Sequence, residues 1–135
     1  MNALIDARAG SAAAQFAIIA PFVLILLGGI MDFGRYAYAG ATLDDAIRQA
    51  LRMAIVRSDV SGNPASQADV VGWVRQKATA LDTTACTATV SYSDGNRPGS
   101  TITIRMVCPF TFLMPGLRHF GTRQLSHEAG LAITT

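Results

Sequence analysis

The hydrophobic positions of this chain form one unbroken apolar run, which is followed by segments of regular spacing. No charged residue occurs from Ala9 to Met31, and Ser11 and Gln15 are the strongly polar residues of that stretch. As a helix, a run of this length spans about 34 Å, close to the thickness of a bilayer core. The run therefore predicts a transmembrane helix at residues 11–33, preceded by a leader-like segment of residues 1–10.

Two other interpretations of this run stay open. A buried core helix is one, although so long an apolar run is unusual in a small protein. A cleaved secretory signal is the other, because Ala37-Tyr38-Ala39 has the form of a cleavage site. Asp32 and Arg35 lie between the run and that site, which argues against cleavage. Inside the run, Pro21 predicts a kink or a local loosening of the helix.

After Met31 the apolar residues recur every three or four positions, which predicts that the helix continues as an amphipathic one. These positions are Leu43, Ile47, Ala50, Leu51, Ala54 and Ile55. Asp44 and Arg48 are four residues apart, in the order that favours an ion pair. Gly34 and Gly40 are expected to soften the junction between the two stretches.

A second helix is predicted from about Gln67 to Leu81. Ser66 and Asp69 have the spacing of a capping box at its start. Val70, Val71, Val74, Ala78 and Leu81 form its apolar stripe. Trp73 belongs either to the edge of the core or to a contact surface, and its aromatic bulk favours the core.

The period then changes to two, which predicts strands. Residues 87–92 and 101–106 alternate around a turn and read as a hairpin. A third strand is predicted from Gln124 to Ile133, with Leu125, Ala129, Leu131 and Ile133 on one face. The apolar connection Cys108–Gly121 either covers the core or is an exposed contact patch. The predicted class is α+β: a long N-terminal helix, a second helix, and a small antiparallel sheet.

The two cysteines fit the register of the predicted hairpin. Symmetry about Arg97 opposes Tyr92 to Ile102, Val90 to Ile104, Ala88 to Met106, and then Cys86 to Cys108. Directly opposed residues can form a disulfide, and a loop of about 20 residues closed in this way gains about 3 kcal/mol. Two buried free thiols are the alternative. A disulfide requires an oxidising compartment, which places residues 34–135 outside the cytoplasm and the N-terminus inside.

Composition narrows the classes of function. Charged residues make up 15% of the 135 residues and the net charge is +2, which argues against nucleic acid as the main partner. Ser126-His127-Glu128 has the residue types of a catalytic triad, but successive strand side chains point to opposite faces. His119 and His127 lack a Cys or carboxylate pattern with metal-ligand spacing, and the neighbours Asp44 and Asp45 do not converge on a helix. We predict no enzymatic activity, no catalytic residue, no cofactor and no metal.

The stretch from Arg8 to Pro21 resembles the start of TadE-like proteins, which are pilin-like proteins of tight-adherence (Flp-type) pilus systems. The shared pattern is a basic residue, a glycine, small residues, a Phe-Ala pair, apolar residues and a proline. The stretch Gly28–Arg35 also resembles the family's helix exit. The resemblance implies an anchor in the bacterial inner membrane, a periplasmic α+β domain, and a role as minor subunit or assembly factor. That role would support pilus biogenesis, surface adhesion and secretion.

Related pilins are cut by a prepilin peptidase after a glycine, which here corresponds to the bond between Gly10 and Ser11. The fifth residue after that bond is usually Glu and is followed by Phe16 in this chain. Gln15 takes the place of the Glu, and a neutral amide hydrogen-bonds but cannot form an ion pair. The departure at Gln15 therefore bears on two implications of the resemblance, cleavage after Gly10 and extraction into a filament through a charge pair.

The expected partners are other pilin-like subunits, inner-membrane pilus assembly proteins, a prepilin peptidase and the lipid bilayer. Ala9, Ala13 and Ala17 recur every four residues ahead of Pro21, a spacing that allows close helix packing. Ordinary small-residue composition is the alternative explanation for these alanines. A single-pass membrane protein with an external ligand-binding or sensor domain is the rival function.

Overall fold

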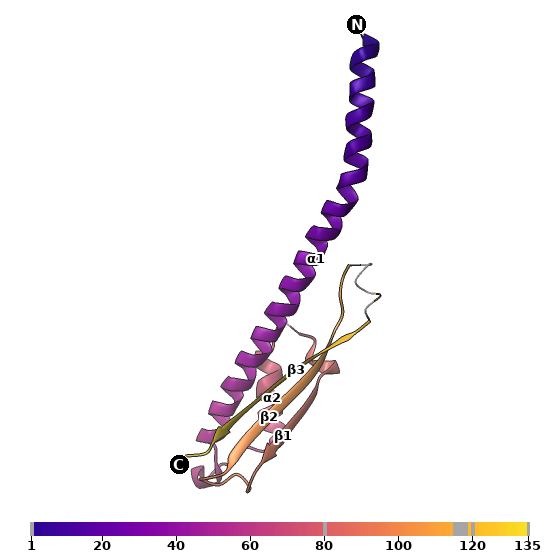
Figure 1. Cartoon of the computed structure of the whole chain (residues 1–135). Helices are drawn as coiled ribbons and strands as arrows, with labels where there is room; N and C mark the ends of the chain where they lie inside the picture. Colours follow the sequence, from indigo (N-terminus) through magenta and orange to yellow (C-terminus); the bar gives the residue numbers. More distant parts are fainter. Residues whose placement is uncertain (1, 80, 115–118, 120, 135) are drawn as a thin grey trace.

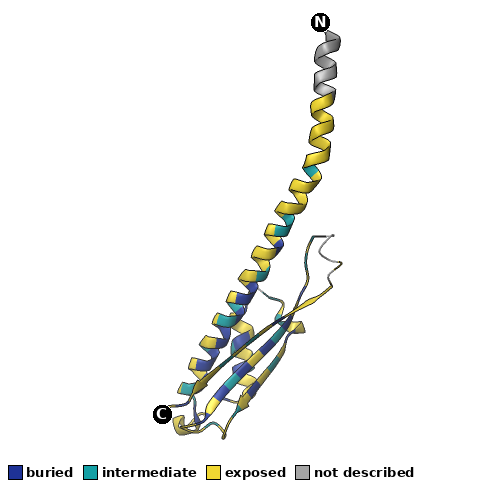
Figure 2. Ribbon diagram, viewed as in Figure 1, coloured by how far each residue is buried: buried dark blue, intermediate teal, exposed yellow. Residues whose placement is uncertain are grey.

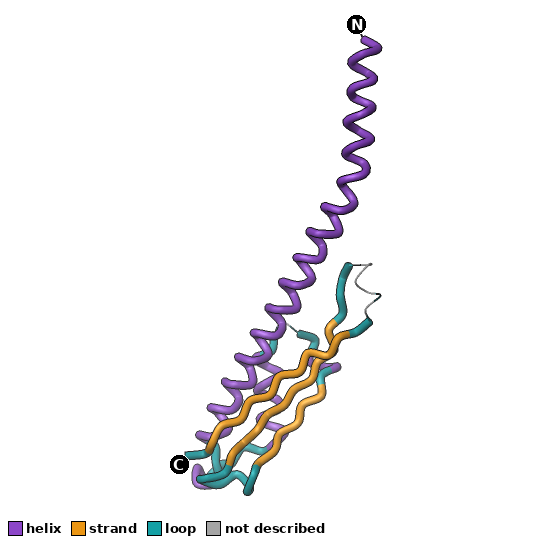
Figure 3. Tube along the Cα trace, viewed as in Figure 1, coloured by secondary structure: helices purple, strands orange, loops and turns teal. Residues whose placement is uncertain are grey.

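The computed structural model describes residues 2–79, 81–114, 119 and 121–134, and of residues 2–10 it describes the backbone alone. The elements are α1 (Asn2–Val56), the short 3-10 helix η1 (Asp59–Ser61), α2 (Gln67–Lys77), the 3-10 helix η2 (Thr83–Ala85), β1 (Thr87–Tyr92), β2 (Thr101–Phe110) and β3 (Arg123–Ala132). Two helices precede a three-stranded antiparallel sheet, so the predicted α+β class is confirmed (Figures 1 and 3).

One helix, α1, carries both the apolar run and the amphipathic stretch. Its N-terminal part projects far beyond the rest of the molecule (Figure 1). At 55 residues it is about 82 Å long. The helix runs through Gly34 and Gly40 without interruption. Its direction changes along the projecting part, which also contains Pro21, the proline inside the helix (Figure 1).

The two ends of α1 lie in different surroundings (Figure 2). Residues 11–31, here called the exposed half, contain no buried residue. Large apolar side chains that are more than half exposed there are Phe16, Ile18, Ile19, Phe22, Leu24, Ile25, Leu26, Leu27, Ile30 and Met31. The core-helix alternative is therefore wrong. From Ser11 onward α1 is long and apolar enough to cross a membrane.

Residues 39–56, here called the packed half, carry the predicted stripe into the core. Leu43, Ile47 and Ala50 are fully buried, and Ala54 is nearly so. This face packs against α2, β2 and β3, while α2 also packs against β1. The two helices thus cover one face of the sheet, and the amphipathic prediction is confirmed.

The start of α2 forms as predicted and its end does not. The Asp69 N–H donates to Ser66 Oγ (3.1 Å) and the Ser66 N–H donates to Asp69 Oδ2 (3.0 Å), which completes the capping box. The helix stops at Lys77 and not at Leu81, because Ala78 leaves helical geometry with ψ 57°. Asp82 then accepts the Thr84 N–H (3.1 Å) and caps η2, which competes with a longer α2.

Trp73 lies at the edge of the core, which decides between its two predicted roles. Its ring is half-buried against the core cluster. The Arg57 guanidinium carbon lies 5.4 Å from the ring centroid, a distance that allows a cation–π contact. The indole therefore ties α2 to the end of α1.

The strand order is β1-β2-β3, and the hairpin register is the predicted one. The inward face of β2 is buried at Ile102, Ile104, Met106, Cys108 and Phe110. The outward face carries Thr101, Thr103 and Arg105 together with Val107 and Pro109. Arg105 pairs there with Glu128 at 4.0 Å.

The third strand lies one residue earlier than predicted. Leu125 and Ile133 are buried as expected, and Ala129 is half-buried. Leu131 is 45% exposed, since β3 is an edge strand with no neighbour beyond it.

Cys86 and Cys108 form a disulfide and are both buried. Thr87, the first residue of β1, pairs with Val107 of β2. Cys86 directly precedes Thr87, and Cys108 directly follows Val107. The hairpin register therefore brings the two thiols together. The bond closes a loop of 22 residues, which by the chain-entropy model contributes about 3 kcal/mol.

Candidate functional site

The segment that follows β2 folds back onto α1 through one carboxylate. Asp32 is 2% exposed. Its Oδ1 and Oδ2 accept the Leu113 N–H at 3.1 and 3.0 Å, and its Oδ2 accepts the Met114 N–H at 2.9 Å. Arg35 Nη1 donates to Oδ1 at 2.9 Å. The connection between β2 and β3 is thereby fixed to a helix residue 81 positions earlier in the chain.

The chemistry of Asp32 explains this attachment. Asp32 is the first charged residue after the apolar run, and a carboxylate in such surroundings is unfavourable unless it is paired. Two backbone donors and one guanidinium satisfy most of its acceptor sites. The same bonds satisfy two N–H groups of a segment that forms no further β-ladder.

A glycine makes room for this contact. A Cβ built on Gly28 would clash with the Met114 side chain, which would then have to move. The neighbouring Gly29 has nothing within 4 Å of the same position. Gly28 therefore lets Met114 lie against the helix one turn N-terminal to Asp32.

Aromatic rings support the same region. Tyr36 and Phe110 meet edge to face with centroids 5.3 Å apart, and Phe110 meets Phe112 in the same way at 5.5 Å. Arg35 lies over the Phe110 ring at 5.5 Å. Such contacts add to the stabilisation that burial provides. They connect α1 with the end of β2 just below the Asp32 attachment.

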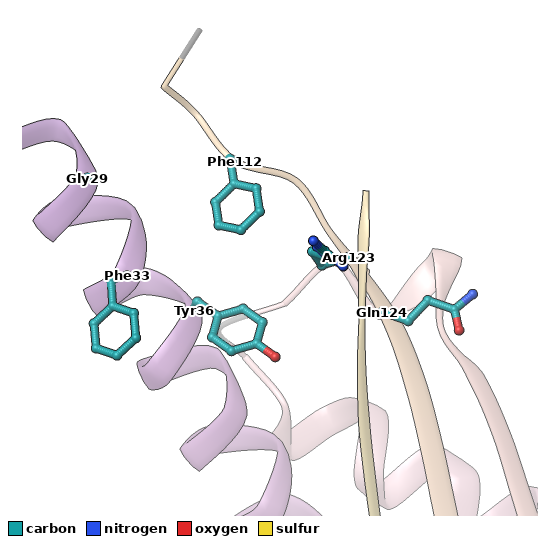
Figure 4. A pocket seen from close by; sticks show the side chains of 6 residues that line it. All are labelled: Gly29, Phe33, Tyr36, Phe112, Arg123 and Gln124. Atoms are coloured by element: carbon teal, nitrogen blue, oxygen red, sulfur yellow. The ribbon is translucent and has the colours of Figure 1, made fainter. Parts of the chain in front are cut away.

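A cavity of about 660 Å³ opens between α1 and the end of the sheet. Its lining residues are Gly29, Phe33, Tyr36, Phe112, Arg123 and Gln124. Figure 4 shows Tyr36 pointing from α1 toward the strands and Phe112 pointing back from the segment after β2, while Gln124 points away from α1. The walls are mainly aromatic with one guanidinium, Arg123. Such a cavity suits an apolar group and provides no pair of nucleophile and base.

A smaller cavity of about 190 Å³ adjoins the Asp32 attachment. Its lining residues are Gly28, Met31, Asp32, Arg35, Leu113 and Met114. Within the described residues, no group of three or more His, Cys, Asp or Glu side chains is placed to hold a metal ion. Both cavities lie where the exposed half of α1 meets the domain.

The residues with triad chemistry do not come together. His127 is half-buried on the helix-facing side of β3, whereas Ser126 and Glu128 are exposed on the other side. Asp44 pairs with Arg48 at 2.9 Å. Asp45 accepts a hydrogen bond from Gln49 at 2.7 Å. Ser126 and His127 thus lie on opposite faces of β3, and Asp44 and Asp45 are each bonded within their own helix, as the strand and helix geometry predicted.

The residues of the N-terminal motif lie on the projecting helix. Ser11, Gln15 and Phe16 are exposed, and Gln15 Nε2 donates to Ser11 Oγ at 3.5 Å, one turn away. Ala13, Ala17 and Pro21 are also exposed and lie far from the domain.

Ala9 and Gly10 belong to the part of α1 described by its backbone alone, and that backbone is helical. The side-chain surroundings of Ala9 lie outside the described residues. The bond between Gly10 and Ser11 thus lies inside a continuous helix.

Sequence reasoning missed the attachment at Asp32. It treated Asp32 as a flanking charge and left Cys108–Gly121 open between a core cover and an exposed patch. The described part of that connection does both, since Phe110 is buried and Leu113 is 71% exposed. The available signal was a lone carboxylate directly after an apolar run, with Arg35 three positions later.

Residues 10–52 match the family model described as TadE-like protein. This part of the chain, about a third of its length, is therefore similar to the TadE-like family. The matched segment covers the exposed half of α1, the Asp32–Arg35 pair and most of the packed half. No curated protein and no solved structure matches the chain significantly. TadE-like proteins form a structural and assembly family associated with the Tad pilus, so the resemblance seen in the sequence is confirmed.

Proposed function

We propose that this TadE-like chain is a single-pass anchor of the bacterial inner membrane and a pilin-like minor subunit or assembly factor of a tight-adherence pilus. One observation carries the proposal. An apolar helix with its side chains exposed runs into a folded domain without a break, and the family match spans that helix. An apolar surface on all sides of a helix suits lipid or other apolar helices and not water.

The disulfide supports the orientation. Cys86 and Cys108 pair in the domain, and a lasting disulfide requires an oxidising compartment. The domain then lies in the periplasm and residues 1–10 lie in the cytoplasm. A prepilin peptidase would act at the Gly10–Ser11 bond, on the cytoplasmic side.

Cleavage at that bond would place the new amino terminus at Ser11, one helical turn from Gln15. The Gln15 amide already hydrogen-bonds within that turn. The Gln15 side chain can accept a hydrogen bond from an amine without carrying a charge. Placing this neutral amide in a bilayer costs less free energy than placing a carboxylate there. Gln15 would therefore permit insertion while giving up the ion pair that a Glu provides.

N-terminal sequencing and intact mass of the protein recovered from native membranes test the proposal. A start at Ser11 supports prepilin-type processing and a pilus subunit. A start at Met1 supports a permanent anchor that assists assembly. A start at Gly40 would follow cleavage after Ala39 and would overturn the membrane anchor.

The small-residue face provides a test of partner binding. Ala13 and Ala17 lie on one side of the helix, and Ala14 lies about a quarter turn away. An Ala13→Leu substitution should lower co-purification with pilin-like partners, because it prevents close helix approach. Ala14→Leu adds the same volume on another face and should leave recovery unchanged. Equal recovery for both variants would count against this face.

A further inference from the structure

We infer that the segment after β2, residues 112–114, is a second membrane contact, which lies in the outer interfacial layer of the same bilayer that α1 crosses. The inference rests on the proposed anchor. It goes beyond the anchor because it assigns a lipid partner to a part of the sheet domain. Three observations carry it: the level of this segment on α1, its exposed side chain, and the satisfaction of its backbone.

The hydrogen bonds to Asp32 fix the position of residues 112–114 along the axis of α1. Leu113 and Met114 donate to Asp32, which immediately follows the apolar run. Met114 then reaches Gly28, which lies about 6 Å further along the apolar part of the helix. A helix that crosses a bilayer with this run therefore holds the segment at the bilayer surface and directs Met114 into it.

The exposure of Leu113 agrees with a position at the bilayer surface. Leu113 is 71% exposed, and Met31 and Phe33 of α1 are exposed to the same extent. Exposure of a large apolar side chain to water does not stabilise the protein, whereas its transfer from water to the interfacial layer of a bilayer is favourable in free energy. Phe33 and, one turn on, Tyr38 (66% exposed) supply the aromatic side chains that favour membrane interfaces.

The backbone makes such a position possible. Irregular chain is unfavourable in lipid because its N–H groups lose their hydrogen bonds to water. Here the N–H groups of both Leu113 and Met114 are bonded to Asp32. The charge on Asp32 is in turn paired with Arg35, which is 47% exposed and keeps its cationic head at the surface. The cluster therefore presents apolar side chains to the bilayer while the Leu113 and Met114 N–H groups and the Asp32 carboxylate are paired.

Fluorescence quenching in lipid vesicles tests this inference on the full chain. Trp73 is the single native tryptophan, and Trp73→Phe gives a background in which new tryptophans report alone. Three variants are compared: Phe22→Trp in the exposed half of α1, Leu113→Trp, and Val60→Trp. Val60, at the far end of the domain, is 70% exposed and matches Leu113 in exposure. The quenchers are phospholipids brominated near the headgroup or near the end of the acyl chain.

We expect Leu113→Trp to be quenched most by the shallow bromines, with emission at a shorter wavelength than that of Val60→Trp. Phe22→Trp should be quenched most by the deep bromines. Val60→Trp should be quenched by neither. Adding Asp32→Ala to Leu113→Trp should reduce the shallow quenching, whereas adding Asp44→Ala, which breaks an exposed helix pair, should not.

The outcomes separate this inference from the proposed anchor. Quenching of Phe22→Trp with none at Leu113→Trp overturns the lipid contact and leaves the anchor intact. A short-wavelength emission at Leu113→Trp without quenching means that protein covers the segment, which also overturns the inference. Absence of quenching at Phe22→Trp overturns the anchor itself.

Discussion

The exposed and packed halves of α1 are parts of one uninterrupted helix, yet they are suited to different surroundings. In the exposed half, apolar side chains occur all around the helix and none is buried. In the packed half, they recur every three or four residues and lie in the core. Helical geometry is the same in both, so the distribution of polar residues around the axis decides what each half contacts.

The change between the halves is confined to a short stretch. Asp32 and Arg35 are the first charges after the apolar run, and Ala39 is already in the core. The connection from β2 meets the helix in this stretch. The boundary between the two environments is therefore also the place where the sheet is attached.

The largest expected difference comes from shortening one isoleucine in each half. Ile47→Ala removes a fully buried side chain and should lower the free energy of unfolding by about 2–5 kcal/mol. Ile25→Ala removes a side chain that is 63% exposed and touches no core, so it should leave the domain's stability unchanged. Thermal or denaturant unfolding in detergent, followed through Trp73, measures both. Equal losses would mean that the exposed half packs on the domain.

Reduction of the disulfide is the next largest effect and should be confined to the domain. Replacing Cys86 and Cys108 together by Ala should lower the free energy of unfolding by about 3 kcal/mol, because the unfolded chain gains loop entropy. The exposed half of α1 should keep its helix content in detergent. Unfolding curves with and without reductant provide the measurement. A reductant effect in the double variant would contradict the assignment.

A smaller, local effect is expected at the boundary. Asp32→Ala removes the acceptor of the Leu113 and Met114 N–H groups, so these two amides should exchange with solvent faster. Global unfolding should change little, since the core is untouched. Asp44→Ala breaks the exposed pair with Arg48 on the same helix and should leave both amides unaffected. Hydrogen exchange read residue by residue compares the variants.

The smallest effect concerns pH. The exposed half holds no ionisable side chain, so acid sensitivity should belong to the domain. Hydrogen bonds from the Ser66 N–H and hydroxyl hold the pKa of Asp69 below its usual value of 3.8. A carboxyl with a lowered pKa stabilises the fold above its unfolded pKa, and this stabilisation is lost as the pH falls through the folded pKa. The stability gap between the native chain and Asp69→Asn should therefore shrink as the pH falls below about 5, and it should keep shrinking through the lowered folded pKa. A constant gap in denaturant titrations would show that Asp69 acts through packing.

Much of the fold follows from local rules, which is why the sequence predicted it. The hairpin register follows from alternation about one turn, and it brings Cys86 to Cys108. The capping box follows from the spacing of Ser66 and Asp69. The packed half follows from its three- and four-residue periodicity.

The features that were missed depend on contacts between distant segments or on competition between neighbouring caps. The end of α2 is set by Ala78 and by the Asp82 cap, neither of which interrupts the apolar spacing. The turn between β1 and β2 is also attached to η1, where the Asp59 N–H donates to the Asn96 carbonyl at 2.9 Å. Asn96 Nδ2 in turn donates to the Arg57 carbonyl at 3.2 Å. Periodicity carries no information about such pairs.

The continuity of α1 has a mechanical consequence. No loop separates the exposed half of α1 from the packed half, so a torque or an axial force on the exposed half is transmitted directly to the domain. A rotation of the helix by one residue's step, about 100°, turns the sheet by the same angle. Pro21, within the projecting part, is where the helix loses a backbone hydrogen bond and can bend most easily. A force applied to the helix N-terminal to Pro21 would partly be taken up by bending at Pro21. A force applied between Pro21 and Asp32 would be transmitted to the domain without that loss.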